Sequence, residues 1–114
     1  MRIRRGRVYV VDFNPRVRTK PGKLRPAVVI QDDLLNDAGY PSTIVLPTTT
    51  KLVETKSPLR LRLPAGVGGL ERESDVLVAQ VIAVANESFR KELGVLPDEL
   101  MATLCERLRA VTGL

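Results

Sequence analysis

A cationic side chain that could act on a phosphate lies in the segment Gly-Lys-Leu-Arg-Pro-Ala-Val-Val-Ile, residues 22–30. Arg25 precedes Pro26, and a residue before proline is pushed toward an extended conformation. Because proline cannot donate a ladder hydrogen bond, Pro26 belongs at the start or on the edge of a strand. A guanidinium held by such rigid backbone suits a phosphate, since its planar fork gives two parallel charge-assisted hydrogen bonds. The alternative is that Arg25 caps the sheet edge against a carboxylate.

Three consecutive threonines form a second group of candidate donors. Thr48, Thr49 and Thr50 follow Pro47 and an apolar segment at 43–46. If that segment is a strand, the three hydroxyl groups lie at the rim of a sheet, where they could donate to a ligand. Threonine also has a high intrinsic preference for strands, so propensity alone is the simpler explanation.

A basic loop is predicted between the first two strands, at residues 16–24. It contains Arg16, Arg18, Lys20 and Lys23, with a turn signal at Pro21-Gly22. Loops carried on a rigid scaffold often hold binding residues. A solvated hairpin tip is the alternative interpretation.

The composition restricts the chemistry available to this chain. There is no histidine and one cysteine among 114 residues. This excludes the usual zinc sites, Ser-His and Cys-His nucleophile pairs, and any histidine-based ribonuclease mechanism. Catalysis would have to use Arg, Lys, Ser, Thr or carboxylate side chains, and no metal or other cofactor is expected.

Length and charge indicate the class of protein. A chain of 114 residues is expected to form a single domain, residues 1–114, and its formal net charge of +5 favours a polyanionic partner such as nucleic acid. The lone cysteine excludes an internal disulfide and fits a reducing cytoplasm. No segment is typical of a signal peptide or of a membrane span.

The elements that must position these residues follow from periodicity and breakers. Residues 7–13 alternate, with Val8 and Val10 on one face and Tyr9, Val11 and Phe13 on the other. Further strands are predicted at 27–31, 43–46, 58–63, 75–85 and through 93–96, with a polar turn or short helix at 32–42 and no regular element at 65–69. A helix at 97–112 begins at Pro97, ends at Gly113 and presents an apolar stripe formed by Leu100, Met101, Leu104, Leu108 and Val111. Cys105 lies beside this stripe and is interpreted as a packing residue.

Two of the predicted strands contain polar residues of interest. Gln80 interrupts the apolar segment 75–85, which is expected to be a central strand buried on both faces. Its amide is either a structural tie or a group that contacts a ligand where the strand reaches the surface. In the strand at 58–63 three leucines point inward, while Arg60 and Arg62 point outward and keep that face wet or add to a basic surface.

The ordered set of these segments resembles the MazF/PemK family of toxin–antitoxin ribonucleases over nearly the whole chain. The resemblance rests on Gly6-Arg7-Val8-Tyr9-Val10-Val11-Asp12-Phe13, on residues 22–30, on the end of the third strand from Ile44 to Thr50, on the strand around Gln80 and on the closing helix. It implies a mainly β fold with a C-terminal helix, a small curved antiparallel sheet or SH3-like barrel of the CcdB/PemK type. It also implies a homodimer and a metal-independent endoribonuclease that cuts single-stranded RNA and is neutralised by a cognate antitoxin.

Family positions transfer to this chain as follows. The catalytic arginine falls on Arg25 and the catalytic threonine on Thr49, with Thr48 as the competitor if the register shifts by one. RNA contacts are implied for Arg18, Thr19, Lys20, Lys23, Thr48 and Gln80. Two positions depart from the family pattern: Lys20-Pro21 replaces a frequent Glu-Gln pair, and Ile82 replaces an arginine.

The implied chemistry needs no nucleophile from the protein. The 2′-hydroxyl of RNA attacks the adjacent phosphate, Arg25 stabilises the developing charge, Thr49 donates a hydrogen bond, and the ends are a 2′,3′-cyclic phosphate and a 5′-hydroxyl. Phe13 and Tyr40 are the candidate stacking platforms for unstacked bases, with Phe13 also a core candidate. The alternatives are a non-catalytic toxin that poisons DNA gyrase, as CcdB does, and a plain RNA-binding barrel.

Overall fold

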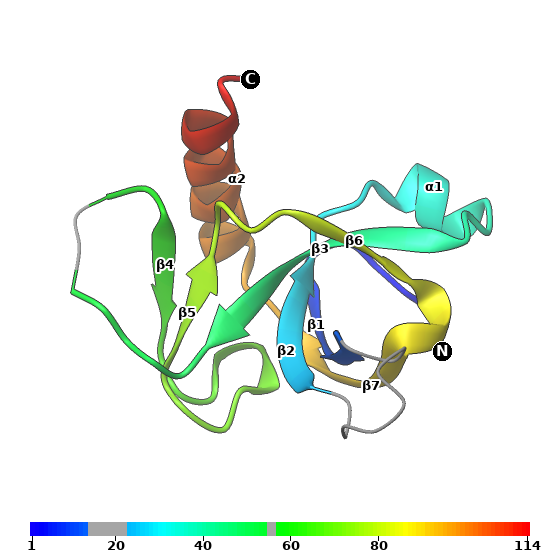
Figure 1. Ribbon diagram of the computed structural model, residues 1–114, viewed down its shortest axis with the longest axis horizontal. Helices are drawn as coiled ribbons and strands as arrows, with labels where there is room; N and C mark the ends of the chain where they lie inside the picture. The colour runs from blue at the N-terminus through cyan, green and yellow to red at the C-terminus, as the bar shows by residue number, and fades with distance from the viewer. Residues whose placement is uncertain (14–22, 55–56) are drawn as a thin grey trace.

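The computed structural model describes residues 1–13, 23–54 and 57–114, which form a strongly curved antiparallel sheet and a long C-terminal helix (Figure 1). The sheet has seven strands: β1 (Arg7–Asp12), β2 (Leu24–Val29), β3 (Ser42–Thr49), β4 (Arg60–Leu63), β5 (Ser74–Leu77), β6 (Ile82–Ala85) and β7 (Phe89–Val95). The helices are α1 (Asp33–Asp37) and α2 (Asp98–Thr112), with short 3₁₀ turns η1 (Val67–Gly69) and η2 (Asn86–Ser88). The predicted mainly β fold with a C-terminal helix is confirmed.

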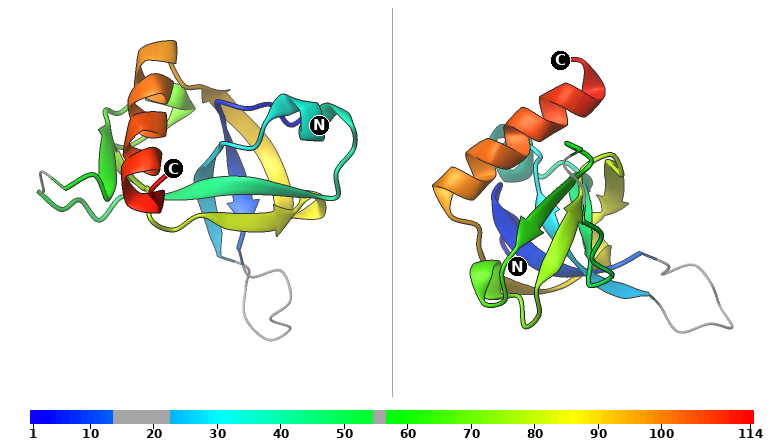
Figure 2. Two further views of the ribbon diagram at one scale, coloured as in Figure 1. Left: turned by 90° about the horizontal axis from the view of Figure 1, so that it is seen from above. Right: turned by 90° about the vertical axis from the view of Figure 1, so that its left-hand side faces the viewer.

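Strand β3 links the two parts of the sheet. The strand order is β4-β5-β3-β2-β1-β7, and β6 also pairs with β3. On one side β3 pairs with β2. On its other side it pairs first with β6, at Ser42 to Val45, and then with β5, at Thr48 and Thr49. Figure 2 shows the resulting curvature, with β4 and β5 at one end and the α1 region at the other.

The alternation in the first strand separates two hydrophobic clusters. Val8 packs in one cluster, while Tyr9 and Val11 pack in the other, with Phe13 against it, as the period-2 pattern predicted. The first cluster also receives β4, β5 and helix α2, and the second is closed by β6 and β7. The buried members of the first are Val8, Val28, Leu46, Leu61, Leu63, Leu70, Val76, Val78, Leu96 and Leu104. Those of the second are Tyr9, Val11, Ala27, Val29, Val45, Val84 and Phe89.

The ends and the apolar face of helix α2 agree with the prediction from the sequence. Pro97 is the N-cap residue, and Gly113 ends the helix with φ of 76°, a left-handed conformation that glycine adopts without a Cβ penalty. Leu104 is fully buried in the first cluster. The rest of the predicted stripe packs against the same cluster: Leu100, Met101, Leu108 and Val111. Cys105 accepts a hydrogen bond from Nη2 of Arg5 at 3.1 Å.

The prediction of one buried strand at 75–85 is wrong. The segment forms two strands, β5 and β6. Residues 79–83, which connect β5 to β6 and begin β6, are exposed. In β3, Val45 pairs with Ile82 of β6 and Thr48 pairs with Val76 of β5. Two residues separate these pairings in β3, whereas the five residues 77–81 separate them on the opposite side. Pro47 has no N–H to continue the ladder, so the opposing chain leaves the sheet at this point.

Several strand boundaries differ from the predicted ones. Strand β2 begins at Leu24, so Arg25 and Pro26 lie inside it, and β3 continues through Pro47 to Thr49. Strand β4 begins only at Arg60, which leaves Leu59 half exposed instead of buried. The last strand begins earlier than predicted, at Phe89.

The glycine-rich segment at 65–69 is a 3₁₀ turn that rests on β7. A Cβ atom at Gly69, where φ is 76°, would lie 2.0 Å from the carbonyl oxygen of Leu93. Only glycine permits this close approach, which brings η1 onto the first hydrophobic cluster.

Candidate functional site: a cleft between β2 and β3

The antiparallel pairing of β2 and β3 brings Arg25 and Thr49 to the same place. The last paired residues are Ala27 and Pro47, so two steps further along each strand Arg25 lies opposite Thr49. Pro26 has no N–H, so the backbone ladder cannot continue past it. A cleft of about 350 Å³ opens here, which we name the β2–β3 cleft. It is lined by Leu24, Arg25, Pro26, Thr48, Thr49, Thr50, Lys51 and Ser74.

The two threonines that compete for the catalytic position have different environments. Thr48 is 2% exposed, and its hydroxyl donates a hydrogen bond of 2.9 Å to the carbonyl oxygen of Pro26. This bond closes the strand pair where the proline ends the ladder. Thr49 is partly exposed, and its Oγ1 accepts a hydrogen bond of 3.1 Å from the Lys51 amide. Since that bond uses a lone pair, the proton of the Thr49 hydroxyl remains available to a ligand.

Arg25 is partly exposed and lies without a counter-ion among the described residues, where its guanidinium makes no hydrogen bond or ion pair. The alternative role considered above, a cap against a carboxylate, therefore has no partner within residues 1–13, 23–54 and 57–114. An arginine side chain remains protonated. The cleft is thus supplied with a positive charge and with donors that no protein acceptor of the described part uses.

A second depression adjoins the first through Arg25. This Gln80 groove has a volume of about 630 Å³ and is lined by Phe13, Lys23, Arg25, Pro47, Gln80, Val81 and Ile82. It lies where the chain between β5 and β6 leaves the sheet opposite Pro47. Gln80 is exposed there, so of its two predicted roles the structure supports surface exposure and not a buried tie. Phe13 both packs against the second hydrophobic cluster and lines the groove.

The two arginines of β4, near this edge of the sheet, are bound to a carboxylate. Asp75, in β5, is 1% exposed and forms ion pairs with Arg62 Nε at 2.6 Å and with Arg60 Nη1 at 3.1 Å. Burial by itself would raise the pKa of Asp75, but hydrogen bonds from Arg62, the Val53 amide and Arg60 outweigh it and lower the pKa. Arg60 and Arg62 therefore do not simply hydrate their face of β4, as the sequence suggested.

The remaining residues predicted to contact RNA do not all lie at the site. Some lie elsewhere in the structure or outside the described residues. Lys23 is exposed beside Arg25 in the Gln80 groove. The predicted RNA contacts Arg18, Thr19 and Lys20 lie outside the described residues. Tyr40 lies before the start of β3, whereas Thr49 is its last residue; an eight-residue strand separates its ends by roughly 25 Å, so Tyr40 is remote from the cleft.

Sequence reasoning missed two residues that line the cleft and one that lines the neighbouring groove. Ser74 and Lys51 line it, and the amide of Lys51 orients Thr49. Pro47 shapes the neighbouring groove. A proline in each of two adjacent strands, Pro26 and Pro47, was the available signal, because Pro26 removes a donor from the β2–β3 ladder and Pro47 removes one from the other edge of β3.

Within the described ranges, no group of three His, Cys, Asp or Glu side chains is arranged to hold a metal ion. Neither α-helix there combines the length and hydropathy that a membrane-spanning helix requires. The described residues of the cleft and the adjoining groove present a guanidinium, hydroxyl groups, lysine side chains and the amide of Gln80.

Comparisons with known proteins identify the family of the chain. Residues 4–112 match the family model described as PemK-like, MazF-like toxin of type II toxin-antitoxin system. The chain is 32% identical to endoribonuclease EndoA of Bacillus subtilis (strain 168) over 114 residues, which is 100% of this chain and 97% of that protein.

Solved structures with the same fold include a MazF and an endoribonuclease. MazF from Deinococcus radiodurans superposes with a TM-score of 0.79 at 22% identity, covering 100% of this chain and 99% of that one. An endoribonuclease from Mycobacterial species, solved in complex with its cognate antitoxin, gives a TM-score of 0.78 at 14% identity and covers 98% and 96% of the two chains. With the match to residues 4–112, these findings confirm the predicted resemblance: the chain belongs to the PemK-like, MazF-like toxin family of type II toxin–antitoxin systems.

Proposed function

We propose that this chain is a toxin that acts as a metal-independent endoribonuclease on single-stranded RNA, with Arg25 and Thr49 as its catalytic residues. The observation that carries the proposal is that Arg25 and Thr49 line the same β2–β3 cleft. The guanidinium of Arg25 has no counter-ion among the described residues, and the Thr49 hydroxyl has a proton available for a ligand. The 32% identity to endoribonuclease EndoA over the whole chain supports the same activity.

The reaction uses a nucleophile that belongs to the substrate. The 2′-oxygen forms a bond to the adjacent phosphorus and gives up its proton to water. The bond from phosphorus to O5′ breaks, and O5′ takes a proton from water, which leaves a 2′,3′-cyclic phosphate and a 5′-hydroxyl. Arg25 stabilises the charge that develops on the phosphoryl oxygens, and Thr49 donates a hydrogen bond to one of them. Positioning of sugar and phosphate in one cleft supplies the rest of the acceleration.

The Gln80 groove is the proposed path of the RNA next to the cleft. Lys23 provides a phosphate contact, Gln80 presents donors and an acceptor to base edges, and Phe13 offers an aromatic face. Thr48 is assigned a structural role instead of an RNA contact, because its hydroxyl is buried and donates to Pro26.

The partners of the proposed toxin follow from its relatives. The Mycobacterial endoribonuclease was solved in complex with its cognate antitoxin, and a MazE-MazF structure from Deinococcus radiodurans covers 100% of this chain. We assign to this chain a cognate antitoxin, a homodimeric state and a cytoplasmic location.

The test is incubation of the purified protein with a long single-stranded RNA in excess EDTA, followed by mapping of both fragment ends. We expect cleavage at a small set of short sequences, with 2′,3′-cyclic phosphate and 5′-hydroxyl ends. Intact RNA together with gyrase-dependent DNA breaks would instead indicate a gyrase poison. Binding of RNA without fragments would indicate a plain RNA-binding barrel.

A further inference from the structure

A buried carboxylate lies directly beside the proposed catalytic threonine. Asp75 of β5 is in register with Thr49 of β3, and its side chain is 1% exposed. Oδ1 of Asp75 accepts from Arg62 Nε at 2.6 Å. Oδ2 accepts from Arg60 Nη1 at 3.1 Å and from the Val53 amide at 3.2 Å. The proposed mechanism gives this carboxylate no part in the reaction.

The same cluster holds the chain that follows β3. Arg60 Nη1 also donates to the carbonyl oxygen of Lys51 at 2.9 Å, and Arg62 Nη2 donates to the carbonyl oxygen of Val53 at 3.2 Å. Residues 51–54 are exposed, so apolar burial does little to fix them. Their position therefore depends on these polar bonds, all of which come from Asp75 or from the two arginines that it orients.

One bond leads from this segment to the proposed catalytic hydroxyl. The Lys51 amide donates to Thr49 Oγ1 at 3.1 Å. It occupies one lone pair of the oxygen and so limits the directions in which the hydroxyl proton can point. A shift of the Lys51 backbone would free the Thr49 side chain to take another rotamer.

We propose that Asp75 is a positioning residue for RNA cleavage, which acts through Arg60 and the Lys51 backbone to hold the Thr49 hydroxyl toward the β2–β3 cleft. Asp75 does not touch the RNA. This inference rests on the proposed function for its kinetic effect, while the geometric part, order at Lys51, can be measured without activity.

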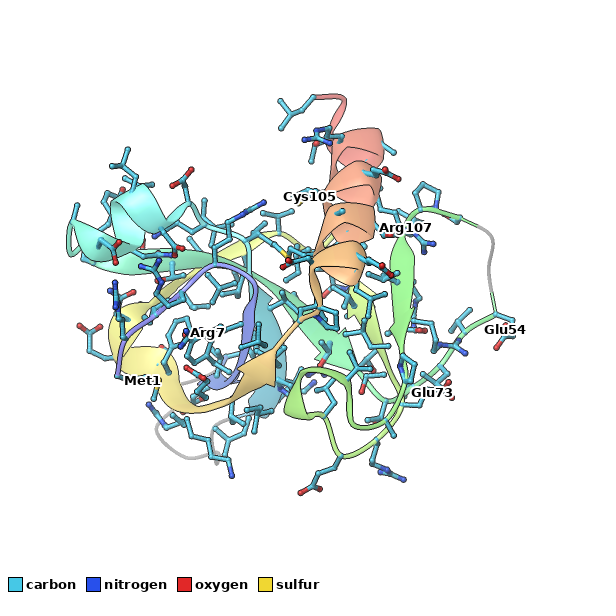
Figure 3. All side chains as sticks on the ribbon, turned by 180° about the vertical axis from the view of Figure 1, so that it is seen from behind. Met1, Arg7, Glu54, Glu73, Cys105 and Arg107 are labelled. Atoms are coloured by element: carbon cyan, nitrogen blue, oxygen red, sulfur yellow. The ribbon has the colours of Figure 1, made fainter. Side chains whose placement is uncertain are left out.

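A matched control lies in the same cluster. Glu54 pairs with Arg62 Nη1 at 3.2 Å, but its side chain is 92% exposed, and it lies at the periphery of the molecule on the loop after β3 (Figure 3). Glu54→Gln removes a carboxylate from Arg62 without touching Asp75, Arg60 or Lys51. It therefore reports the effect of charge alone.

The kinetic experiment measures kcat and KM on a short RNA substrate for wild type, Asp75→Asn and Glu54→Gln. We expect Asp75→Asn to lower kcat by about tenfold to a hundredfold with KM within about twofold, because a displaced reacting group loses rate more than binding. Glu54→Gln should remain within about twofold of wild type in both constants. Cleavage by Asp75→Asn at the wild-type kcat would overturn the inference.

A double-mutant cycle separates positioning from general destabilisation. In the Thr49→Ala background, Asp75→Asn should lower the single-turnover rate by less than about twofold, because the hydroxyl that it positions is gone. An equal fractional loss in both backgrounds would show that Asp75 acts on the fold as a whole, and the inference would be wrong. If Asp75→Asn does not fold, Arg60→Gln replaces it, since that variant leaves the Arg62–Asp75 pair in place.

Amide hydrogen exchange tests the geometry even if the wild type cleaves no RNA. Exchange at the Lys51 and Val53 amides should accelerate at least about tenfold in Asp75→Asn and stay unchanged in Glu54→Gln. Inactive wild type would contradict the proposed function alone. Unchanged exchange at Lys51 in Asp75→Asn would contradict the positioning role alone.

Discussion

Arg25 and the pair Arg60 and Arg62 present the same functional group at neighbouring parts of the sheet, yet their surroundings differ. Arg25 lines two depressions and has no hydrogen bond or ion pair among the described residues. Arg60 and Arg62 share the buried carboxylate of Asp75. The guanidinium of Arg25 can place its donors on a phosphate, whereas those of the other two hold Asp75 and the loop after β3. A neighbouring carboxylate therefore decides whether an arginine serves a ligand or the fold.

The largest expected effect comes from Arg25. Arg25→Ala should reduce the cleavage rate about 10²–10³-fold, by analogy with the loss of one oxyanion donor, and change the free energy of unfolding by less than about 0.5 kcal/mol. Rates on a defined RNA in EDTA and urea unfolding curves check the two parts. Wild-type cleavage by this variant would remove Arg25 from the mechanism.

For the buried carboxylate of Asp75 we expect a large effect on stability, unlike that of Arg25. Asp75→Ala should lower the free energy of unfolding by about 2–3 kcal/mol, because it leaves two arginines without their shared partner. The value is below that for a fully buried pair, since the side chains of Arg60 and Arg62 are 25% and 30% exposed and water relieves part of the loss. Urea unfolding measures it, with Glu54→Gln as the control. A midpoint equal to that of wild type would show that the cluster contributes nothing to stability.

Two adjacent threonines sharpen the same contrast between a structural and a functional donor. Thr48→Val should reduce the free energy of unfolding by about 1–2 kcal/mol, because the Pro26 carbonyl oxygen loses its hydrogen bond. Thr49→Val should leave stability within about 0.5 kcal/mol and lower the cleavage rate about tenfold to a hundredfold. Parallel unfolding and cleavage assays on both variants check this. The reverse pattern would move the catalytic position to Thr48.

The smallest expected effect is the dependence of the free energy of unfolding on acidic pH, through Asp75. The pKa of Asp75 is lowered in the folded state, so its ion pairs stabilise the fold above the unfolded pKa of about 4, and this contribution is lost as the pH falls through the lower folded value. The free energy of unfolding should therefore fall between about pH 5 and pH 3, and fall less in Asp75→Asn. Unfolding curves at several pH values measure the difference. Equal slopes for the two proteins would contradict the lowered pKa.

Local sequence signals predicted much of the architecture. The alternation in β1 assigned Val8 and Tyr9 to opposite faces, and Pro97 and Gly113 marked the ends of the α2 region. The prediction failed at residues 75–85, where a largely apolar segment around Gln80 indicated one buried strand. The chain divides there because Pro47, far away in the sequence, cannot donate to it. The residues around Gln80 do not indicate this break, because it depends on Pro47 in another strand.

The sequence by itself determined the family, the mainly β fold and the restriction to chemistry without histidine. It also placed Arg25 in extended backbone before Pro26. Only the tertiary structure decided that Arg25 and Thr49 line one cleft, that Thr48 is buried, and that Arg60 and Arg62 form ion pairs with Asp75. The reason is physical: backbone conformation depends on neighbours in sequence, whereas the partner of a charge or hydroxyl is set by strand pairing between distant segments.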